Sequence, residues 1–339
     1  MLASGLSGGR TVAAVLACLV LLLGAAAADP VRIRAGWVVT PASLVPILFA
    51  KEGLARHQGV SYRFEPIFIG GSPPQITAIA AGELEIATLG FSSFPIAVQN
   101  AQLSDLRIIA DETQDGVHGY FTVRYLVGKD SPVTKVEDLK GKIVAVNTHG
   151  SAADLGMRTF LARHGLNLPR DYTLLEVPFP TMKAVLADHK ADLITATLPF
   201  VYDPELVKIA RTLFTAEDAV GGTELSFWCV RGDFLKKNRA ALVDLLEDTL
   251  RSYRWYADPA NHKEAIAILA KFTKRPPETL DGWAFTQKDF YRDLDGRPNL
   301  QALQKNIDDE QALGFIKDRL VVAPYAELSL VKEAAARVK

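Results

Sequence analysis

An alternation of short apolar runs with amphipathic stretches, which occurs twice along the 339 residues, constrains the fold of this chain more than any other feature. Short apolar runs predict buried strands and amphipathic stretches predict helices. Their alternation therefore predicts an α/β fold in which each sheet is mostly parallel and is flanked by crossover helices. The first series predicts strands at 31–37, 61–67, 85–89 and 106–110, and helices at 43–57, 74–81 and 94–101.

The alternation restarts near residue 120 and forms a second series. This series predicts strands at 120–128, 143–147, 173–177 and 193–197, and helices at 151–164, 181–189 and 204–211. The apolar run 224–230 is expected to return the chain to the first unit, and 233–339 is expected to be mainly helical. The predicted organisation is a first lobe at 29–124, an inserted second lobe at 125–220, and a return to the first lobe with C-terminal helices at 221–339.

Residues 1–28 have the three parts of a secretory signal peptide: one basic residue at Arg10, an apolar run at 12–23, and a stretch of alanines that ends at Ala28. The apolar run is shorter than the about 20 residues that a spanning helix needs, which disfavours a retained membrane anchor. We therefore expect cleavage after Ala28 and export to the periplasm. A lipid anchor at Cys18 is the less favoured alternative, because the apolar run continues past that cysteine.

Composition and charge narrow the classes of function. With 49% hydrophobic and 23% charged residues, the chain has the composition of a globular protein rather than of a disordered one. Its formal net charge of −1 argues against non-specific binding to nucleic acid or to an anionic membrane. Removal of Cys18 with the signal peptide would leave Cys229 alone, so no intrachain disulfide is expected.

Ligand sites in open α/β folds favour the carboxyl ends of strands and the interface between two domains. Candidate binding residues are therefore sought in the loops that follow predicted strands, at 38–41, 70–74, 90–95, 148–152 and 197–200. Gly70 and Gly71 would let the backbone approach a ligand closely. Ser92 and Ser93 offer hydroxyl donors, although capping of the next helix explains them equally well.

The loop 148–152 carries the clearest chemical signal. Ser151 is a suitable N-cap for the helix that follows, and Gly150 permits the turn before it. The free N–H groups and the positive end of the helix dipole would then form a site for an anion. His149 would add a donor, or a full charge when protonated. Simple capping without any ligand remains the alternative for this segment.

Signatures of catalysis and of metal binding are missing from the sequence. The six histidines lack the spacing of a metal site, and no G-x-S-x-G motif of a hydrolase nucleophile follows the predicted signal peptide. Cys229 lies in an apolar run, which is typical of a buried structural thiol. We therefore expect no enzyme activity, no cofactor and no metal. Trp228, in the same run, is kept as a binding candidate.

Several segments, by their order and spacing, resemble those of periplasmic solute-binding proteins of ABC importers, of the nitrate/sulfonate/taurine type. These segments are Ile33–Trp37, Phe49–Leu54, Ala80–Ala87, Asp138–Val146 and Ala187–Asp192. The resemblance implies a two-lobed fold of the periplasmic-binding-protein class, with the ligand cleft between the lobes and without catalysis.

The resemblance also implies a function and a set of contacts. The expected function is capture of a small organic anion (a sulfonate, a taurine-like compound or an aromatic carboxylate) and its delivery to a membrane permease by a monomeric protein. A thiamin-pyrimidine precursor as the solute, and a secreted enzyme that uses the same cleft, remain alternatives. The expected ligand contacts are Trp37, Thr40, Gly71, Ser72, Phe91, Ser92, Ser93, His149, Gly150, Ser151, Ala152 and Pro199, with His118 and Trp228 as further candidates.

Overall fold

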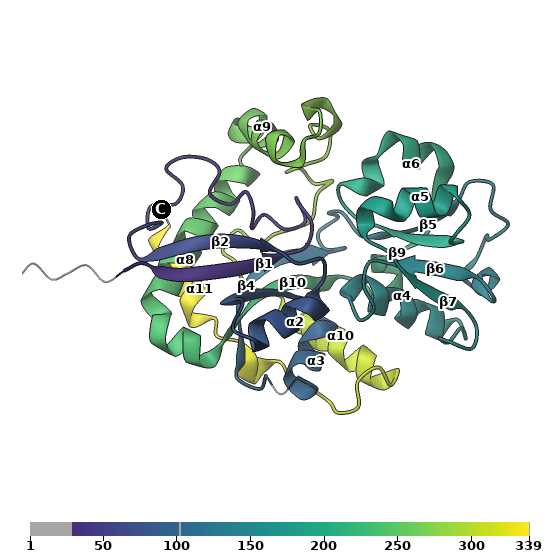
Figure 1. Ribbon diagram of the computed structural model, residues 1–339, viewed down its shortest axis with the longest axis horizontal. Coiled ribbons are helices and arrows are strands. Elements are labelled where there is room, and N and C mark those ends of the chain that lie inside the picture. The colour runs from purple at the N-terminus through teal and green to yellow at the C-terminus, as the bar shows by residue number, and fades with distance from the viewer. Residues whose placement is uncertain (1–28, 102, 339) are drawn as a thin grey trace, which may run out of the picture. The chain divides into compact units, whose positions relative to one another are not determined.

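Two five-stranded sheets organise the structure, a computed structural model that describes residues 29–101 and 103–338 (Figure 1). The strands of the first sheet lie in the order β2-β1-β3-β10-β4. They are β1 (Val31–Trp37), β2 (Tyr62–Phe68), β3 (Ile86–Gly90), β4 (Leu106–Asp115) and β10 (Thr223–Arg231). This sheet and its flanking helices are called lobe 1.

The second sheet and its helices form lobe 2. Its strands lie in the order β7-β6-β8-β5-β9. They are β5 (Arg124–Gly128), β6 (Ile143–Val146), β7 (Thr173–Glu176), β8 (Leu193–Ala196) and β9 (Ala210–Thr215). The chain passes from lobe 1 to lobe 2 between β4 and β5, and it returns between β9 and β10.

Each sheet is mostly parallel, as predicted, because four of its five strands run in the same direction and the fifth runs against them. β1 pairs in parallel with β2 and β3, and β6 pairs in parallel with β7 and β8. In contrast, β10 is antiparallel to β3 and β4, and β5 is antiparallel to β8 and β9. The antiparallel strands are the ones that follow each passage between the lobes. An alternation of strands and helices carries no information about the direction of a strand that arrives from another sheet.

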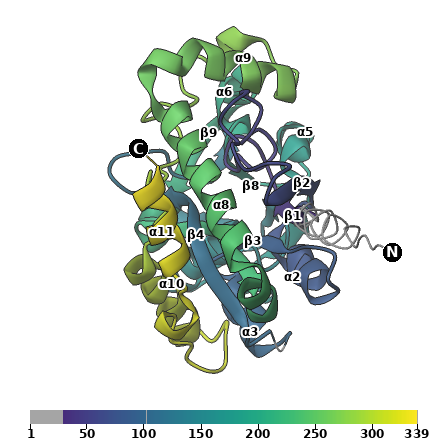
Figure 2. The ribbon, with the colours of Figure 1, turned by 90° about the vertical axis from the view of Figure 1, so that its left-hand side faces the viewer.

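Helices flank both sheets (Figures 1 and 2). They are α2 (Ser72–Ala80), α3 (Ser93–Gln99), α4 (Ala152–Arg163), α5 (Met182–Ala187), α6 (Pro204–Ile209), α7 (Ala216–Val220), α8 (Gly232–Ala257), α9 (His262–Thr273), α10 (Leu300–Ala312) and α11 (Ser329–Arg337). Figure 2 shows α8 crossing lobe 1 with α11 beside it. The buried face of α8 carries Leu242, Leu246 and Leu250 at a spacing of about one helical turn, so this long helix covers the sheet with an apolar stripe.

The segment 43–57, which was predicted to be a helix, contains none. A backbone hydrogen bond there spans three residues, from the amide of Ile47 to the carbonyl of Leu44. Pro46 lacks an N–H group and disfavours helical backbone at the residue before it. Leu44, Ile47 and Leu48 are all buried. The apolar residues of this segment therefore pack into the core from successive turns of the chain.

Further boundaries also differ from the predictions. The strand predicted at 120–128 begins only at Arg124. The predicted helix at 204–211 ends at Ile209, and the chain continues as the edge strand β9, which pairs with β5. The strand that was predicted to end at 110 continues as β4 to Asp115, although residues 111–115 are polar. These five polar residues are buried. Apolar patterning marks the end of a strand wrongly when a buried strand continues with polar side chains.

Several predictions lie outside what the structure tests. Residues 1–28 are outside the described residues, so the signal peptide, cleavage after Ala28 and the lipid alternative at Cys18 stay predictions. Val31–Lys339 form one compact unit, and the lobe boundaries near 124 and 220 also remain predictions. In the part of the chain that the structure describes, no helix is long and apolar enough to cross a membrane.

One face of α10 buries two polar side chains that have no partners. Asn306 and Glu310 lie one helical turn apart, and each is 1% exposed. Neither the amide atoms of Asn306 nor the carboxylate oxygens of Glu310 have a hydrogen-bond partner. Burial, and to a smaller extent the charge of Asp309, raise the pKa of Glu310 to about 8. Folding therefore favours the protonated form of this carboxyl group.

We expect the free energy of unfolding to fall as the pH rises from about 5 to about 8, because folded Glu310 holds its proton up to about pH 8 whereas the unfolded chain releases it near 4.5. One such group contributes a slope of about 1.4 kcal/mol per pH unit. Glu310→Gln removes this part of the slope. Burial raises the pKa of Asp115 to about 7, and the contribution of Asp115 to the slope is unchanged in this variant. Urea unfolding at several pH values measures the slope for the wild-type protein and for Glu310→Gln. Identical slopes in the two proteins would contradict the raised pKa of Glu310.

Candidate functional site

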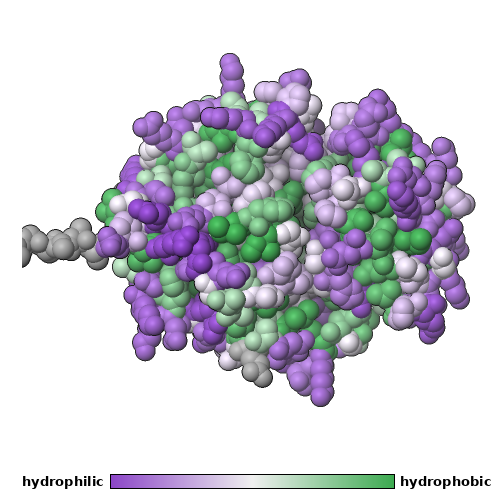
Figure 3. Space-filling model, in the orientation of Figure 1, coloured by the Kyte–Doolittle hydropathy of each residue, from purple (hydrophilic) through white to green (hydrophobic). Residues whose placement is uncertain are grey.

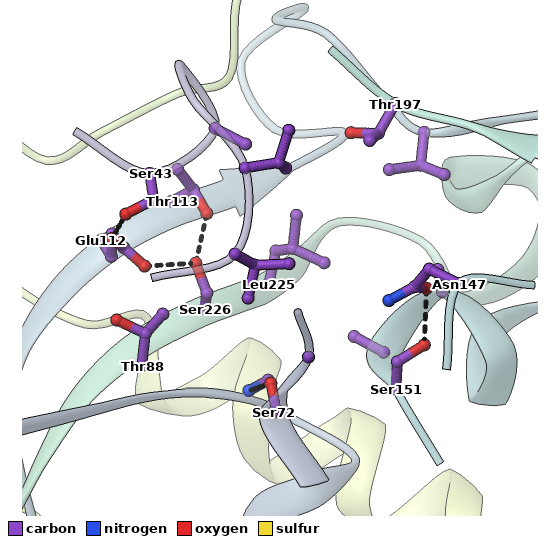
Figure 4. A pocket seen from close by; sticks show the side chains of 18 of the residues that line it. Ser43, Ser72, Thr88, Glu112, Thr113, Asn147, Ser151, Thr197, Leu225 and Ser226 are labelled. Atoms are coloured by element: carbon purple, nitrogen blue, oxygen red, sulfur yellow. Dashed lines mark hydrogen bonds between the residues drawn. The ribbon is translucent and has the colours of Figure 1, made fainter. Parts of the chain in front are cut away.

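A cavity, called the main cavity below, lies between the two lobes at the carboxyl ends of several strands (Figure 4). Its empty volume is about 640 Å³, which includes open solvent at its mouth. Both lobes contribute to its walls, which consist of Val38, Val39, Ala42, Ser43, Gly71, Ser72, Thr88, Gly90, Glu112, Thr113, Val123, Asn147, Ser151, Ala152, Ala153, Phe179, Thr197, Leu225, Ser226 and Phe290. The cavity is therefore found at the place where the strand order predicted a binding site.

An irregularity in the pairing of β4 with β10 brings polar side chains to this cavity. Thr113 lies opposite Ser226, whereas Glu112 on β4 and Leu225 on β10 have no partner residue across the ladder. A regular strand points successive side chains to opposite faces, and a bulge interrupts that alternation. Glu112 and Thr113 consequently both line the cavity, as do Leu225 and Ser226.

Hydroxyl groups surround the carboxylate of Glu112 on the lobe 1 side of the cavity (Figure 4). Ser43 Oγ donates to Oε1 at 2.5 Å, and Ser226 Oγ donates to Oε2 at 3.1 Å. The hydroxyl oxygens of Thr113 and Ser226 are hydrogen-bonded to each other at 2.5 Å. Glu112 is 1% exposed. Burial raises the pKa of Glu112, while the hydrogen bond from Ser43 and the charge of Arg292 oppose that increase.

The N-terminus of α4 forms the lobe 2 side of the cavity. Ser151 is the N-cap, and its Oγ accepts from the amide of Asp154 at 3.2 Å and donates to Asn147 Oδ1 at 2.9 Å. Ala152 and Ala153, the first two helical residues, line the cavity. N–H groups in the first turn of a helix have no acceptor within the helix, and the helix dipole makes this end positive. This side therefore offers hydrogen-bond donors.

A buried carboxylate already occupies part of this helix terminus. Oδ2 of Asp154 accepts from the amide of Gly150 at 2.8 Å, and it lies 3.5 Å from Nη1 of Arg158 and 3.8 Å from Nδ1 of His149. Burial raises the pKa of Asp154, and the hydrogen bond from Gly150 opposes the increase. The amide of His149 donates to Glu176. The amide of Ser151 donates to the carbonyl of Thr148 at 3.1 Å. Three amides of the loop that was predicted to bind an anion are thus used within the protein.

The loop before α4 is attached to lobe 1 by hydrogen bonds. The hydroxyls of Ser92 and Ser93 donate to the carbonyl of Gly150 at 3.0 Å and 3.1 Å. Gly150 has a φ of +79°, which glycine adopts without strain. At Gly71, an added Cβ atom would lie 2.8 Å from Oγ1 of Thr148. Glycine at position 71 therefore permits close approach of the two lobes.

A second cavity, called the aromatic cavity below, adjoins the first, and five of its 15 lining residues are aromatic. Its empty volume is about 820 Å³ including open solvent, and it shares with the first cavity Val38, Val39, Asn147 and Phe179. The ring of Trp37 contacts Phe68 and Phe272 edge-on, at centroid distances of 4.9 Å and 5.8 Å. Phe68 is 63% exposed and Phe272 is 40% exposed. Figure 3 shows hydrophobic surface over the carboxyl ends of β1 and β2, where this cavity opens. Arg275 also lines it.

The structure places the predicted contact residues in different surroundings. The main cavity is lined by Gly71, Ser72, Ser151 and Ala152, and the aromatic cavity by Trp37, Thr40 and Pro199. Ser92, Ser93 and Gly150 take part in hydrogen bonds between the lobes, whereas the side chain of His149 is exposed. The ring of His118 packs against Tyr291, and Phe91 and Trp228 are buried in the core. Ligand contact by these residues stays a prediction.

Sequence reasoning missed the polar residues that line the lobe 1 side of the cavity, which are Ser43, Thr88, Glu112, Thr113 and Ser226. Most of them lie inside strands, whereas the search considered loops. The run 111–115, Asp-Glu-Thr-Gln-Asp, directly follows an apolar stretch and was the available signal. Buried polar side chains need partners, so such a run at the end of a strand indicates either a polar network or a site.

One group of described side chains has the composition of a metal site. His57, Asp244 and Glu247 offer ligand atoms within 4.8 Å of one another. However, Arg251 pairs with Glu247 at 2.5 Å, and Arg337 pairs with Asp244 at 3.0 Å. The arginines compensate both carboxylates, so the group is explained as an ion-pair network.

Comparison with known proteins identifies the family. Residues 26–270, more than half of the chain, match the NMT1-like family. The chain belongs to that family. This NMT1-like protein is also similar to the nitrate/nitrite binding protein NrtA of Synechococcus elongatus, with 31% identity over 153 residues. The similarity covers 42% of this chain and 33% of NrtA, so the match spans about a third of that relative.

Solved structures show the same fold. The alkanesulfonate-binding protein SsuA of Xanthomonas axonopodis pv. citri, bound to MOPS, has a TM-score of 0.69 at 20% identity, over 89% of this chain and 100% of that chain. The periplasmic nitrate-binding protein NrtA of Synechocystis PCC 6803 has a TM-score of 0.70 at 16% identity, over 91% and 89%. The desulfurization enzyme DSZB has a TM-score of 0.60 at 14% identity, over 91% and 100%. The two-lobed α/β class predicted for the NMT1-like protein is thus confirmed.

We expect the hydroxyls of Ser92 and Ser93 to substitute for each other in binding the carbonyl of Gly150. Each single variant, Ser92→Ala or Ser93→Ala, keeps one donor and should lose little stability. The double variant leaves a buried carbonyl without a donor, and it should lose about 1–3 kcal/mol of the free energy of unfolding. Urea unfolding measures all three variants, and strictly additive losses would show that the two hydroxyls do not share this carbonyl.

Proposed function

We propose that this protein is the solute-binding component of an ABC import system of the nitrate/sulfonate type. It is exported to the periplasm, captures a small organic anion between its lobes and delivers the anion to a membrane permease. The observation that carries the proposal is a cavity lined by residues of both lobes, because a solute bound there holds the lobes together. Membership of the NMT1-like family, and neighbours named for binding nitrate or alkanesulfonate, support it.

The acidic group of the solute would bind at the N-terminus of α4. The amides of Ala152 and Ala153 lack acceptors within the helix, and Ser151 and Asn147 lie beside them. No lysine or arginine occurs among the described residues that line the main cavity. N–H dipoles and the helix dipole would therefore hold the anion, as they do at other helix N-termini. A sulfonate or a carboxylate accepts several such hydrogen bonds at once.

The rest of the solute would be organic. Val38, Val39, Leu225 and Phe290 supply apolar walls in the main cavity, and the aromatic cavity continues from it. Nitrate has no apolar surface to place against these walls, whereas a sulfonate or an aromatic carboxylate does. The geometry therefore favours an organic anion over an inorganic one.

Thermal unfolding of the mature protein tests the function. A ligand present at 100 times its dissociation constant stabilises the folded state by about 2.7 kcal/mol and should raise the Tm by a few degrees. We expect a shift with alkyl sulfonates, taurine or aromatic carboxylates, and none with nitrate. The protein is first unfolded and refolded, so that a solute acquired during expression does not occupy the site. A flat response to every organic anion would contradict the proposal.

A proline at the first position of α4 tests the place of the acidic group. Ala152→Pro removes one N–H donor, and the backbone of Ser151 (φ −72°, ψ 162°) already has the conformation that precedes a proline. We expect affinity for the anion to fall roughly 10- to 100-fold, the effect of losing a hydrogen bond to a charged group. Ala152→Gly, which keeps the N–H group, is the control and should retain most of the affinity. Isothermal titration calorimetry measures both, and equal affinities would place the anion elsewhere.

A thiamin-pyrimidine precursor is the second candidate solute. Phe179 and Phe290 line the cavity and suit a flat ring, and Glu112 suits an amino group on such a ring. Pyrimidines therefore belong in the same thermal-unfolding series. A shift with pyrimidines alone would favour this candidate over an organic anion.

A secreted enzyme is the alternative class of function, since DSZB shares the fold. Cys229 is buried in β10, and burial raises the pKa of its thiol well above the ordinary value. Such a thiol is a poor nucleophile at neutral pH. Release of a bound solute unaltered would favour the binding protein, and its conversion to a product would favour the enzyme.

A further inference from the structure

We infer that Glu112 is a specificity-determining residue that binds an N–H group of the solute, so that the protein selects nitrogen-bearing solutes over their counterparts without that nitrogen. The inference rests on the proposed function in one respect, namely that the solute binds in the cavity between the lobes. It adds the chemistry of the end of the solute that faces lobe 1.

The carboxylate of Glu112 has acceptor capacity that the protein does not fill. Its oxygens accept one hydrogen bond each, from Ser43 and from Ser226. A carboxylate offers about four acceptor positions. The buried indole N–H of Trp228, which has no hydrogen-bond partner of its own, also favours the ionised form of Glu112, so one or two positions remain. Ser226 is in turn hydrogen-bonded to Thr113, which holds it in place. The remaining acceptor positions belong to a side chain that lines the cavity.

Glu112 is also the only titratable side chain among the described residues that line the main cavity. Arg292 is the nearest compensating charge, but its guanidinium donates to the carbonyls of Pro41 and Ala42 and does not line the cavity. A purely anionic solute would place a like charge near a carboxylate in a poorly solvated site, which is unfavourable. An N–H donor removes that conflict and takes up the unused acceptor positions.

The geometry of the cavity suits a solute with two different polar ends (Figure 4). Glu112, Ser43 and Ser226 lie on one side, and Asn147 and Ser151 lie on the other side. Leu225 lies between the two groups in this view. An N–H group would bind at the Glu112 side, and an acidic or other acceptor group would bind at the α4 side. A neutral aminopyrimidine and an amino-bearing sulfonate share this N–H chemistry.

Matched pairs of compounds test the inference by calorimetry. The pairs are taurine with ethanesulfonate, para-aminobenzoate with benzoate, and an aminopyrimidine with pyrimidine. For a pair that binds to the wild-type protein, the compound with the amino group should bind roughly 10- to 100-fold more tightly than the compound without it. Glu112→Gln should abolish this preference. Glu310→Gln, which changes a buried glutamate of α10 in the same way, is the control and should keep the preference.

Each outcome decides a separate question. Equal or tighter binding of the compound without the amino group, in the wild-type protein, would overturn the inference while leaving the proposed function intact. The absence of binding to every member would overturn the proposed function and the inference with it. If Glu112→Gln fails to fold, the comparison within each pair of compounds in the wild-type protein still tests the inference.

Discussion

The antiparallel pairing of β4 with β10 is the interaction on which the rest of the structure depends. β10 lies between β3 and β4, so the sheet of lobe 1 includes a strand that follows the whole of lobe 2 in the sequence. The bulge in the same pairing brings Glu112 and Ser226 to the cavity. One set of contacts between residues distant in sequence thus completes the sheet and forms the polar wall of the site. Contacts of this kind slow folding, because closing the intervening loop costs conformational entropy.

On the side of the cavity formed by the N-terminus of α4, the polar groups that line the cavity are dipoles rather than charged side chains. The N-terminus of α4 contributes amides and a hydroxyl, while Asp154 supplies a buried negative charge directly behind them. Asp154 compensates part of the helix dipole, which weakens the attraction for an anion at this terminus. On the opposite side, Glu112 adds a second carboxyl group. The electrostatics of the cavity thus differ between its two ends, and the proposed selection among solutes rests on this difference.

Small side chains and hydroxyls join the lobes around the cavity. Gly71 allows Thr148 to approach, and Ser92 and Ser93 bind the carbonyl of Gly150. In the proposed function, contacts of this kind would open when the solute enters or leaves. Each neutral hydrogen bond contributes about 1 kcal/mol net, so the lobes are held together by modest interactions that a solute can supplement. Contacts of this strength are compatible with reversible opening.

The amino-acid sequence by itself determined the two-lobed α/β class, most strands and helices, and the strand-end loops that contribute Gly71, Ser72 and Ser151 to the cavity. Those features follow from local periodicity and capping, which neighbouring residues specify. Only the tertiary structure decided the direction of β5 and β10, the absence of a helix at 43–57, and the place of Glu112. These depend on pairing between distant segments: a bulge exists only relative to the partner strand, and burial of a polar run is visible only when the sheet that covers it is known.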